Sequence, residues 1–521
     1  MWQKLSGLLV LTVATVFSSL PPVSQAIAVA TPSSVEATNT LIVSLLQQSH
    51  ELDQQLALPL HLNLLGRQLS IISRLPGDQN VETARQWANE LFTVAAQAKQ
   101  PARSYSQGSA LTVLARLDPQ HALELLHTAQ LEEVGPPSPK MQLAREVFNS
   151  LVSSDGIGVL PLLQQEAEQM GARGQYPYAA LADAANYAVA KDWRDNRQHA
   201  IDIMRSVFEQ AFARYQQSAP DYSNDYEFGA MLRIVAGALP LELIQPALRQ
   251  FVQNVLADSP TKYSYQSRVV TKTGEELRTN DAVDAMIMLY GRLINSVPEL
   301  AQELENTRPE LQSLFECLKK NECNGASFGR TSQTQKARVP DPEQETREAA
   351  SLLSHTNPDV AISKVENLPN DEKGAATALD VARNIAARRP QQASELMEKA
   401  QNTAAIDDNR KQLNIVSAQV SLAAARNQQE QLQQLLQRGF ELARPLVAQS
   451  TDLGPPFITG LPSMVQIGMQ NYPEMTAEFL KNLAPVRMKA ELLIAAAGAL
   501  QLHTRLPVGS RMPSPNAPSN R

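Results

Sequence analysis

A short junction pattern that recurs along the chain constrains its fold more than any other feature. In its full form a proline is followed three residues later by alanine and seven residues later by an apolar residue. Because proline is excluded from the helix interior but fits the first helical position, each junction predicts the end of one helix and the start of the next. Asp118 and Asn357 precede two of the prolines and are good N-caps. The prolines are Pro119, Pro358, Pro390 and, in a looser copy, Pro473.

The residues between these junctions have helical spacing. Apolar residues at intervals of three and four form a clear stripe over residues 84–95, and leucines at 41, 45, 46 and 52 open the pattern. Strand signals are few, and strands do not alternate with helices, which argues against a parallel sheet. Aromatic residues make up only 5% of the chain, so alanine and aliphatic residues must form the core. We therefore predict an all-α fold of stacked antiparallel helix pairs over most of residues 36–503.

The stretch from Asp118 through Pro119 to Ala122 resembles the junction between tetratricopeptide repeats. The Trp, Gly and Tyr positions of that repeat are not filled, and the spacing of 32 residues between Pro358 and Pro390 is not kept elsewhere. The resemblance is therefore to the α-solenoid class, tetratricopeptide-like or HEAT-like, at the junctions only. It implies a curved superhelix of helix pairs with a concave surface, and it carries over no catalytic chemistry.

Three segments interrupt the helical pattern. Residues 263–279 alternate, are rich in Tyr, Val and Thr and contain a Gly turn, which predicts one short β-hairpin inserted between helices. Residues 324–343 are polar with two glycines and two prolines and are interpreted as a linker. Residues 506–521 have too little apolar area to order themselves, and we expect a disordered tail. The expected helical-repeat segments are 31–323 and 344–505.

The first thirty residues have the features of a secretory signal peptide. Lys4 gives a positive start, residues 8–20 are apolar, and small residues allow cleavage after Ala26 or Ala30. We therefore expect a periplasmic or secreted protein with no membrane span after cleavage. The alternative is a retained anchor, for which the apolar run is short.

The two cysteines, Cys317 and Cys323, lie close together in the sequence. In an oxidising compartment such a pair predicts a small-loop disulfide. Free thiols are the alternative. Two cysteines without a neighbouring histidine cannot complete a zinc site, and a redox pair would have C-x-x-C spacing.

No motif for catalysis, metal or cofactor binding is found. The sequence lacks a G-x-S-x-G turn, a phosphate-binding loop and an H-E-x-x-H pair. No two histidines are four residues apart, so we interpret them as surface or capping residues. The net charge is −7 with dispersed Lys and Arg, which is not the footprint of a nucleic-acid binder. The histidines are His50, His61, His121, His127, His199, His355 and His503.

The acidic segment 221–227 is the nearest approach to a calcium loop. Tyr226 stands where the loop needs glycine, and Leu232 stands where it needs a bidentate glutamate. We therefore favour a helix start, with a polar residue of 223–225 as the cap.

Tyrosine is concentrated in one part of the chain, since nine of the eleven lie between residues 176 and 290. Tyrosine combines apolar area with a hydrogen-bonding tip and is enriched at interfaces. Tyrosines in segments expected to be non-helical form the candidate interaction surface. The alternative is a satellite core beneath the hairpin. The four surface residues are Tyr222, Tyr226, Tyr263 and Tyr265.

These features favour an exported, non-enzymatic helical-repeat scaffold that binds a protein or peptide partner in the cell envelope. A structural or assembly component without a discrete ligand is the first alternative. The second is an envelope enzyme with a helical scaffold similar to that of lytic transglycosylases. The catalytic glutamate motif of those enzymes is not found.

Overall fold

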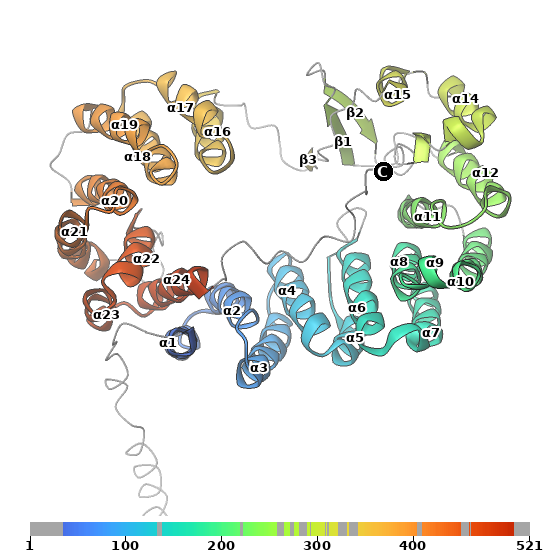
Figure 1. Ribbon diagram of the computed structural model, residues 1–521, viewed down its shortest axis with the longest axis horizontal. Helices are drawn as coiled ribbons and strands as arrows, with labels where there is room; N and C mark the ends of the chain where they lie inside the picture. Colours follow the sequence, from blue (N-terminus) through green and yellow to red (C-terminus); the bar gives the residue numbers. More distant parts are fainter. Residues whose placement is uncertain are drawn as a thin grey trace, which may run out of the picture. The chain divides into compact units, whose positions relative to one another are not determined.

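The computed structural model describes most of the chain between residues 35 and 504, and these residues are mostly helical, as the spacing predicts (Figure 1). They form two compact units, and the chain of unit 1 is interrupted by unit 2. Unit 1 comprises Met1–Leu75 and Pro340–Arg521, and unit 2 comprises Pro76–Val339. The described residues are 35–132, 138–218, 222–257, 265–270, 276–280, 289–291, 293–307, 309, 312–320, 331–332, 342–403, 409–449, 458 and 460–504.

Unit 1 contains helices from both ends of the chain. Their bounds are α1 (Val35–Asp53), α2 (Leu58–Ile72), α16 (Pro342–Thr356), α17 (Pro358–Glu366), α18 (Glu372–Ile385), α19 (Pro390–Thr403), α20 (Asn409–Ala425), α21 (Gln429–Ala448), α22 (Leu461–Asn471), α23 (Pro473–Lys481) and α24 (Val486–Thr504).

Unit 2 contains helices and three strands. Their bounds are α3 (Asp78–Ala95), α4 (Ala102–Leu117), α5 (Pro119–Thr128), α6 (Pro139–Asp155), the 3₁₀ helix η2 (Gly156–Val159), α7 (Leu160–Ala172), α8 (Tyr178–Ala188), α9 (Asp192–Asp195), α10 (Arg197–Gln217), α11 (Tyr222–Val235), α12 (Leu241–Ala257), β1 (Tyr265–Val270), β2 (Glu276–Asn280), α14 (Pro298–Thr307), α15 (Gln312–Lys319) and β3 (Thr331–Ser332).

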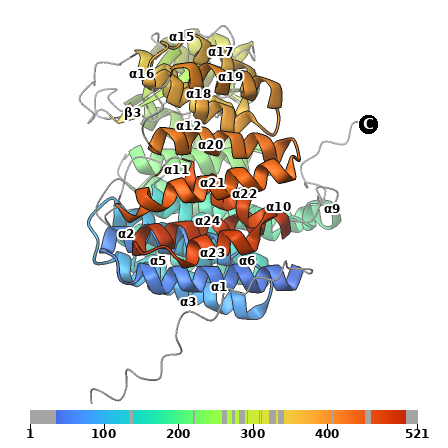
Figure 2. The same cartoon turned by 90° about the vertical axis from the view of Figure 1, so that its left-hand side faces the viewer.

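In each unit a set of helices that are not consecutive in the sequence pack side by side in a row. In unit 1 this row runs α16, α18, α20, α22, α24 and then α1, and α17, α19, α21 and α23 each contact the two row members beside them. Figure 2 shows α18, α20, α24 and α1 as successive layers. In unit 2 the equivalent row is α4, α6, α8 and α11, with α3, α5, α7, α10 and α12 beside it (Figure 1). We call the two rows row A of unit 1 and row A of unit 2.

The junction prolines begin helices as predicted. Helices α5, α17, α19 and α23 each start at the proline of the pattern. The side chains of Asp118 and Asn357 accept the backbone N–H groups of His121 and Val360, so both residues cap their helices. The position three residues after each proline is completely buried, which explains why it is small. These positions are Ala122, Ala361, Ala393 and Thr476.

The two ends of the described chain meet within unit 1. Helix α1 packs along α24, and α2 contacts both. Ser49 donates to the backbone oxygen of Ala490 at 3.0 Å, and Gln501 donates to that of Ile71 at 2.9 Å. The expected N-terminal segment 31–323 is therefore divided in the structure, since its first two helices belong with the C-terminal helices. The second part of unit 1 begins at Pro340.

Three strands lie near the segment for which the sequence predicts a hairpin. Strands β1 and β2 pair antiparallel, with Arg268 opposite Arg278. Strand β3, inside the expected linker, pairs antiparallel with the start of β1 and places Gln266 opposite Thr331. The connection between β1 and β2, the signal segment 1–30 and the expected tail 506–521 lie outside the described residues.

Candidate interaction surface

Row A of unit 2 leaves one stripe of each helix facing solvent. On α6, for example, the stripe contains Arg145 and half-buried Asn149, whereas Val147 and Phe148 are buried. The exposed stripes of α4, α6, α8 and α11 carry tyrosine, arginine, aspartate and asparagine. We call this set the row A surface. Its residues are Tyr105, Arg145, Asn149, Asp183, Tyr187, Tyr226 and Arg233.

An ion pair between two row A helices forms the centre of this surface. The Nε of Arg145 on α6 donates to Oδ2 of Asp183 on α8 at 2.7 Å. Asn149 donates to the same oxygen at 2.8 Å. Burial raises the pKa of Asp183, but the hydrogen bonds from Arg145 and Asn149 outweigh it and hold that pKa below its usual value. The hydrogen bond to Asp183 in turn raises the pKa of Arg145. Both groups are therefore charged at neutral pH.

The outer part of the Arg145 guanidinium is open. Its side chain is 45% exposed, and among the described residues only its Nε makes a hydrogen bond. Arg233 on α11 also interacts favourably with Asp183. Two arginines from different helices thus flank one carboxylate, and one of them has free N–H groups for a partner.

Two exposed tyrosines lie on the same row of helices. Tyr105 on α4 is 77% exposed, and Tyr187 on α8 is 52% exposed. Tyr187 follows Asp183 by one helical turn and so lies on the same face of α8. Tyrosine and arginine are the residue types enriched in protein interfaces, and a side chain this exposed contributes little to the core. This composition suits a contact surface.

The four tyrosines proposed from the sequence have different positions. Tyr226 lies on α11 and is half-buried at the edge of the row A surface. Tyr222 begins α11 and Tyr265 begins β1, but their side chains lie outside the described residues, as does the whole of Tyr263. The expectation that residues 222 and 226 are non-helical is wrong, because α11 starts at Tyr222.

Many of the other tyrosines of this region form core. Tyr178 and Tyr215 are buried against Phe228, whose ring stacks on that of Tyr215 with centroids 3.8 Å apart, and buried Tyr176 packs on Tyr178. Burial raises the pKa of Tyr178 to about 12. The concentration of tyrosine in the sequence therefore arises in part from a buried aromatic cluster among α8, α10 and α11.

Helix α11 carries two buried carboxylates. Asp225 accepts the hydroxyl of Tyr215, which also accepts from Asn254 at 2.9 Å. The predicted cap role of residues 223–225 is thus wrong for Asp225, which lies inside the helix and is buried. Glu227 is the second buried carboxylate, and 5% of its surface is exposed. Burial raises its pKa to about 7, although the backbone N–H of Ala179 and the charge of Arg145 oppose the change.

A second polar cluster is buried in unit 1. Oδ1 of Asp53 on α1 lies 2.9 Å from Nδ1 of His61 on α2, and Oδ2 accepts from Gln68 at 2.7 Å. Gln68 also donates to Ser49 at 2.9 Å. Burial raises the pKa of Asp53, but hydrogen bonds from His50 and His61 outweigh it and lower that pKa. The interpretation of His61 as a surface or capping residue is therefore wrong, and the cluster fixes α1 to α2.

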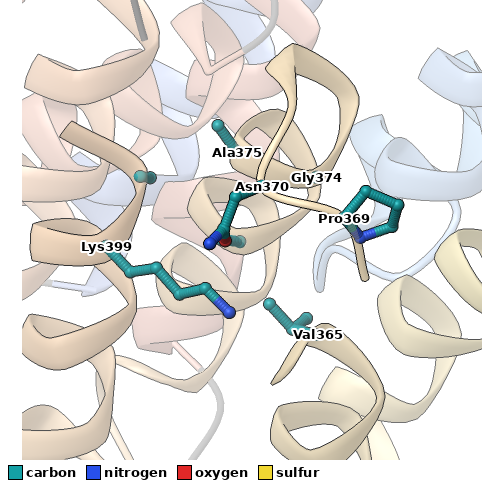
Figure 3. Close-up of a pocket in the computed structure, with 8 residues that line it drawn as sticks. Val365, Pro369, Asn370, Gly374, Ala375 and Lys399 are labelled. Carbon is teal, nitrogen blue, oxygen red and sulfur yellow. The ribbon is translucent and has the colours of Figure 1, made fainter. Parts of the chain in front are cut away.

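A small hollow lies between α17, α18 and α19 of unit 1. Figure 3 shows Lys399 extending toward Val365 and Asn370 at its opening. The hollow has space for about one water molecule. It is therefore too small for a ligand pocket.

The described residues contain no group of three or more His, Cys, Asp or Glu side chains placed to bind a metal ion. No helix among them is long and apolar enough to span a membrane. Cys317 lies on α15 and is 6% exposed, whereas Cys323 lies outside the described residues, so the disulfide stays a prediction. No model of a known protein family matches the chain, and a search of curated proteins gives no match.

Proposed function

We propose that the protein is an exported, non-enzymatic scaffold that binds a protein or peptide partner on the row A surface of unit 2. The observation that carries this proposal is the exposure of two tyrosines near the Arg145–Asp183 pair: Tyr187 on α8, which also carries Asp183, and Tyr105 on the adjacent α4. Aromatic and arginine side chains contribute most of the binding energy in protein interfaces. Tyr226, one of the four tyrosines that the sequence proposes as an interaction surface, is also part of the row A surface.

The helical arrangement supports a repeat scaffold of the α-solenoid class. A row of helices in contact with one another, with the intervening helices packed beside the row, is the pattern that stacked helix pairs produce. In such a stack each helix pair contacts its neighbours only, so exposed stripes of successive helices combine into one extended surface. The secretory signal that the sequence of residues 1–30 predicts supports a location in the periplasm or outside the cell.

The test is capture of partners from a cell-envelope extract by the immobilised full-length protein. Changing Tyr105 and Tyr187 together to alanine should reduce the affinity of the captured partner about 30-fold or more, the effect of losing about 2 kcal/mol at a hot spot. Both residues are exposed, so the melting temperature should stay unchanged.

The control is Leu352→Ala, which removes a 72% exposed apolar side chain from α16 of unit 1. It should leave the affinity unchanged. Equal affinity of the tyrosine variant and the unmodified protein would contradict the proposal. Equal losses in both variants would do the same, because they would show nonspecific adhesion to exposed apolar groups.

A further inference from the structure

The outer edge of the Arg145 guanidinium limits what the row A surface can bind. The Nε of Arg145 donates to Oδ2 of Asp183 at 2.7 Å, and the same oxygen accepts from Asn149 at 2.8 Å. Among the described residues, Nη1 and Nη2 of Arg145 make no hydrogen bond, and 45% of the side chain is exposed. The N–H groups of both nitrogens therefore remain available to a partner.

The contact with Asp183 pre-organises this guanidinium. A long arginine side chain loses rotamer freedom when it binds a partner, and the existing ion pair removes part of that loss before binding. The hydrogen bond to Asp183 also raises the pKa of Arg145, so the group stays charged at neutral pH. Arg145 is thus a fixed cation with one free edge.

The free edge of Arg145 fits a carboxylate. A planar guanidinium meets the two oxygens of a carboxylate through two parallel hydrogen bonds. A phosphate also accepts such bonds, but a phosphorylated side chain carries a charge of about −1.5 to −2 at neutral pH. Asp183 already offsets part of the charge of Arg145, so a singly charged carboxylate is the better match.

Tyr187 adds an apolar contact at a defined spacing from this edge. It follows Asp183 by four residues on α8, so the two lie on one face and about 6 Å apart along the helix axis. Two residues of an extended peptide also span about 6.6 Å. A peptide that runs along α8 can therefore reach Arg145 with one side chain and the exposed Tyr187 with the next but one.

We propose that the partner of the row A surface is an acidic peptide segment. It places an aspartate or glutamate on Arg145 and an apolar side chain, two residues away, on Tyr187. The inference rests on the proposed function, because it names the chemistry of the partner for the same surface.

The first experiment selects peptides from a random library displayed on phage, with the immobilised full-length protein as the target. The selected peptides should be enriched in Asp or Glu two positions from an apolar residue. The acidic enrichment should disappear with Arg145→Gln, and the apolar preference should disappear with Tyr187→Ala. The matched control Arg197→Gln alters an exposed arginine of α10, outside row A, and should keep both.

The second experiment measures the affinity of one selected peptide by fluorescence polarisation. Changing its acidic residue to the corresponding amide should weaken binding to the unmodified protein about tenfold or more, the effect of losing a hydrogen bond between charged groups. The same change should weaken binding to Arg145→Gln less than about twofold, because the two groups then no longer interact. Arg145→Lys keeps the charge but lacks the planar fork, so its loss should lie between these values.

The outcomes separate this inference from the proposed function. Acidic enrichment that persists in Arg145→Gln would overturn the inference. Selected peptides that need Tyr105 and Tyr187 but lack acidic residues would also overturn it, and they would leave the proposed function intact. If no selected peptide depends on these tyrosines, the proposed function is rejected and the inference falls with it.

Discussion

Replacing Gln68 by leucine should loosen the attachment between the two ends of the chain in unit 1. Gln68 is completely buried on α2 and donates to Asp53 and Ser49 of α1 at 2.7 and 2.9 Å. Ser49 in turn donates to the backbone of Ala490 on α24. Leucine has a similar volume, so the substitution removes the hydrogen bonds and creates little cavity.

The size of the effect follows from the bonds that are lost. A hydrogen bond to an ionised carboxylate contributes about 1.5–3 kcal/mol, and a neutral one contributes about 1 kcal/mol. The Oε1 of Gln68 is buried without a partner among the described residues, and its removal returns about 1 kcal/mol. The net loss of unfolding free energy of unit 1 is therefore about 1.5–3 kcal/mol.

Hydrogen exchange followed by mass spectrometry measures this loss locally. Protection of residues 35–72 and 486–504 should fall together by about 10- to 140-fold, since each 1.4 kcal/mol is tenfold. The matched control Gln47→Leu alters an exposed glutamine of α1, and it should change the free energy of opening measured by exchange by less than about 0.5 kcal/mol. Loss of protection in α2 alone, with α24 unaffected, would refute the coupling of the two ends.

Three further predictions follow from other parts of the structure. The pKa of Glu227 rises from 4.5 to about 7 on folding, so its contribution to stability is complete below pH 4.5 and is lost as pH rises through 7. Between pH 4.5 and pH 7 the unfolding free energy of the unmodified protein should therefore fall by about 3 kcal/mol relative to that of Glu227→Gln, as measured by urea titrations. Gly374→Ala should lower the unfolding free energy by about 3 kcal/mol or more, because the new Cβ would lie 2.1 Å from the backbone oxygen of Pro369. Gly439→Ala should lower it by about 1–2 kcal/mol, because the new Cβ meets the methyl group of the flexible Met464 side chain. Thermal melts that show the larger loss for Gly439→Ala would contradict this account of the packing. Cys317 and Cys323 should react with a thiol reagent under denaturing conditions only after reduction, and full reaction without reductant would exclude the disulfide.

The helix junctions could be predicted because their determinants are local. Proline has one favourable position in a helix, and an Asp or Asn just before it supplies the cap, so Pro119 and Pro358 each fix a helix start without knowledge of the fold. The all-α composition follows in the same way from periodicity. These signals need only a few neighbouring residues.

The tyrosine region was harder to predict because burial depends on tertiary contacts. Asp225 and its polar neighbours disfavour a helix interior by local propensity, and the sequence therefore predicts a cap. In the structure the hydroxyl of Tyr215, on the preceding helix, binds the Asp225 carboxylate and compensates for its burial. Local sequence does not show that these two side chains meet.

The buried cluster of unit 1 was missed for a related reason. Asp53 and His61 are eight residues apart and belong to two helices joined by a turn, so neither resembles a site alone. A search for an acid and a histidine on either side of a predicted helix turn could have found the pair. The packing of α1 against α24 has no such signal, because Ser49 and Ala490 are 441 residues apart.

The interrupted chain of unit 1 affects the order in which the protein can fold. A chain is synthesised from its N-terminus, so α1 and α2 are complete before any of unit 2 exists, whereas α24 is made last. During this interval the residues of α1 and α2 that α24 later contacts, such as Ser49 and Ile71, have no native surface to pack against. Unit 2 is contiguous and can fold as it emerges. Truncation of α24 should therefore leave unit 2 folded but expose the helix pair α1–α2. That helix pair is the segment we expect a chaperone to bind while the chain is unfinished.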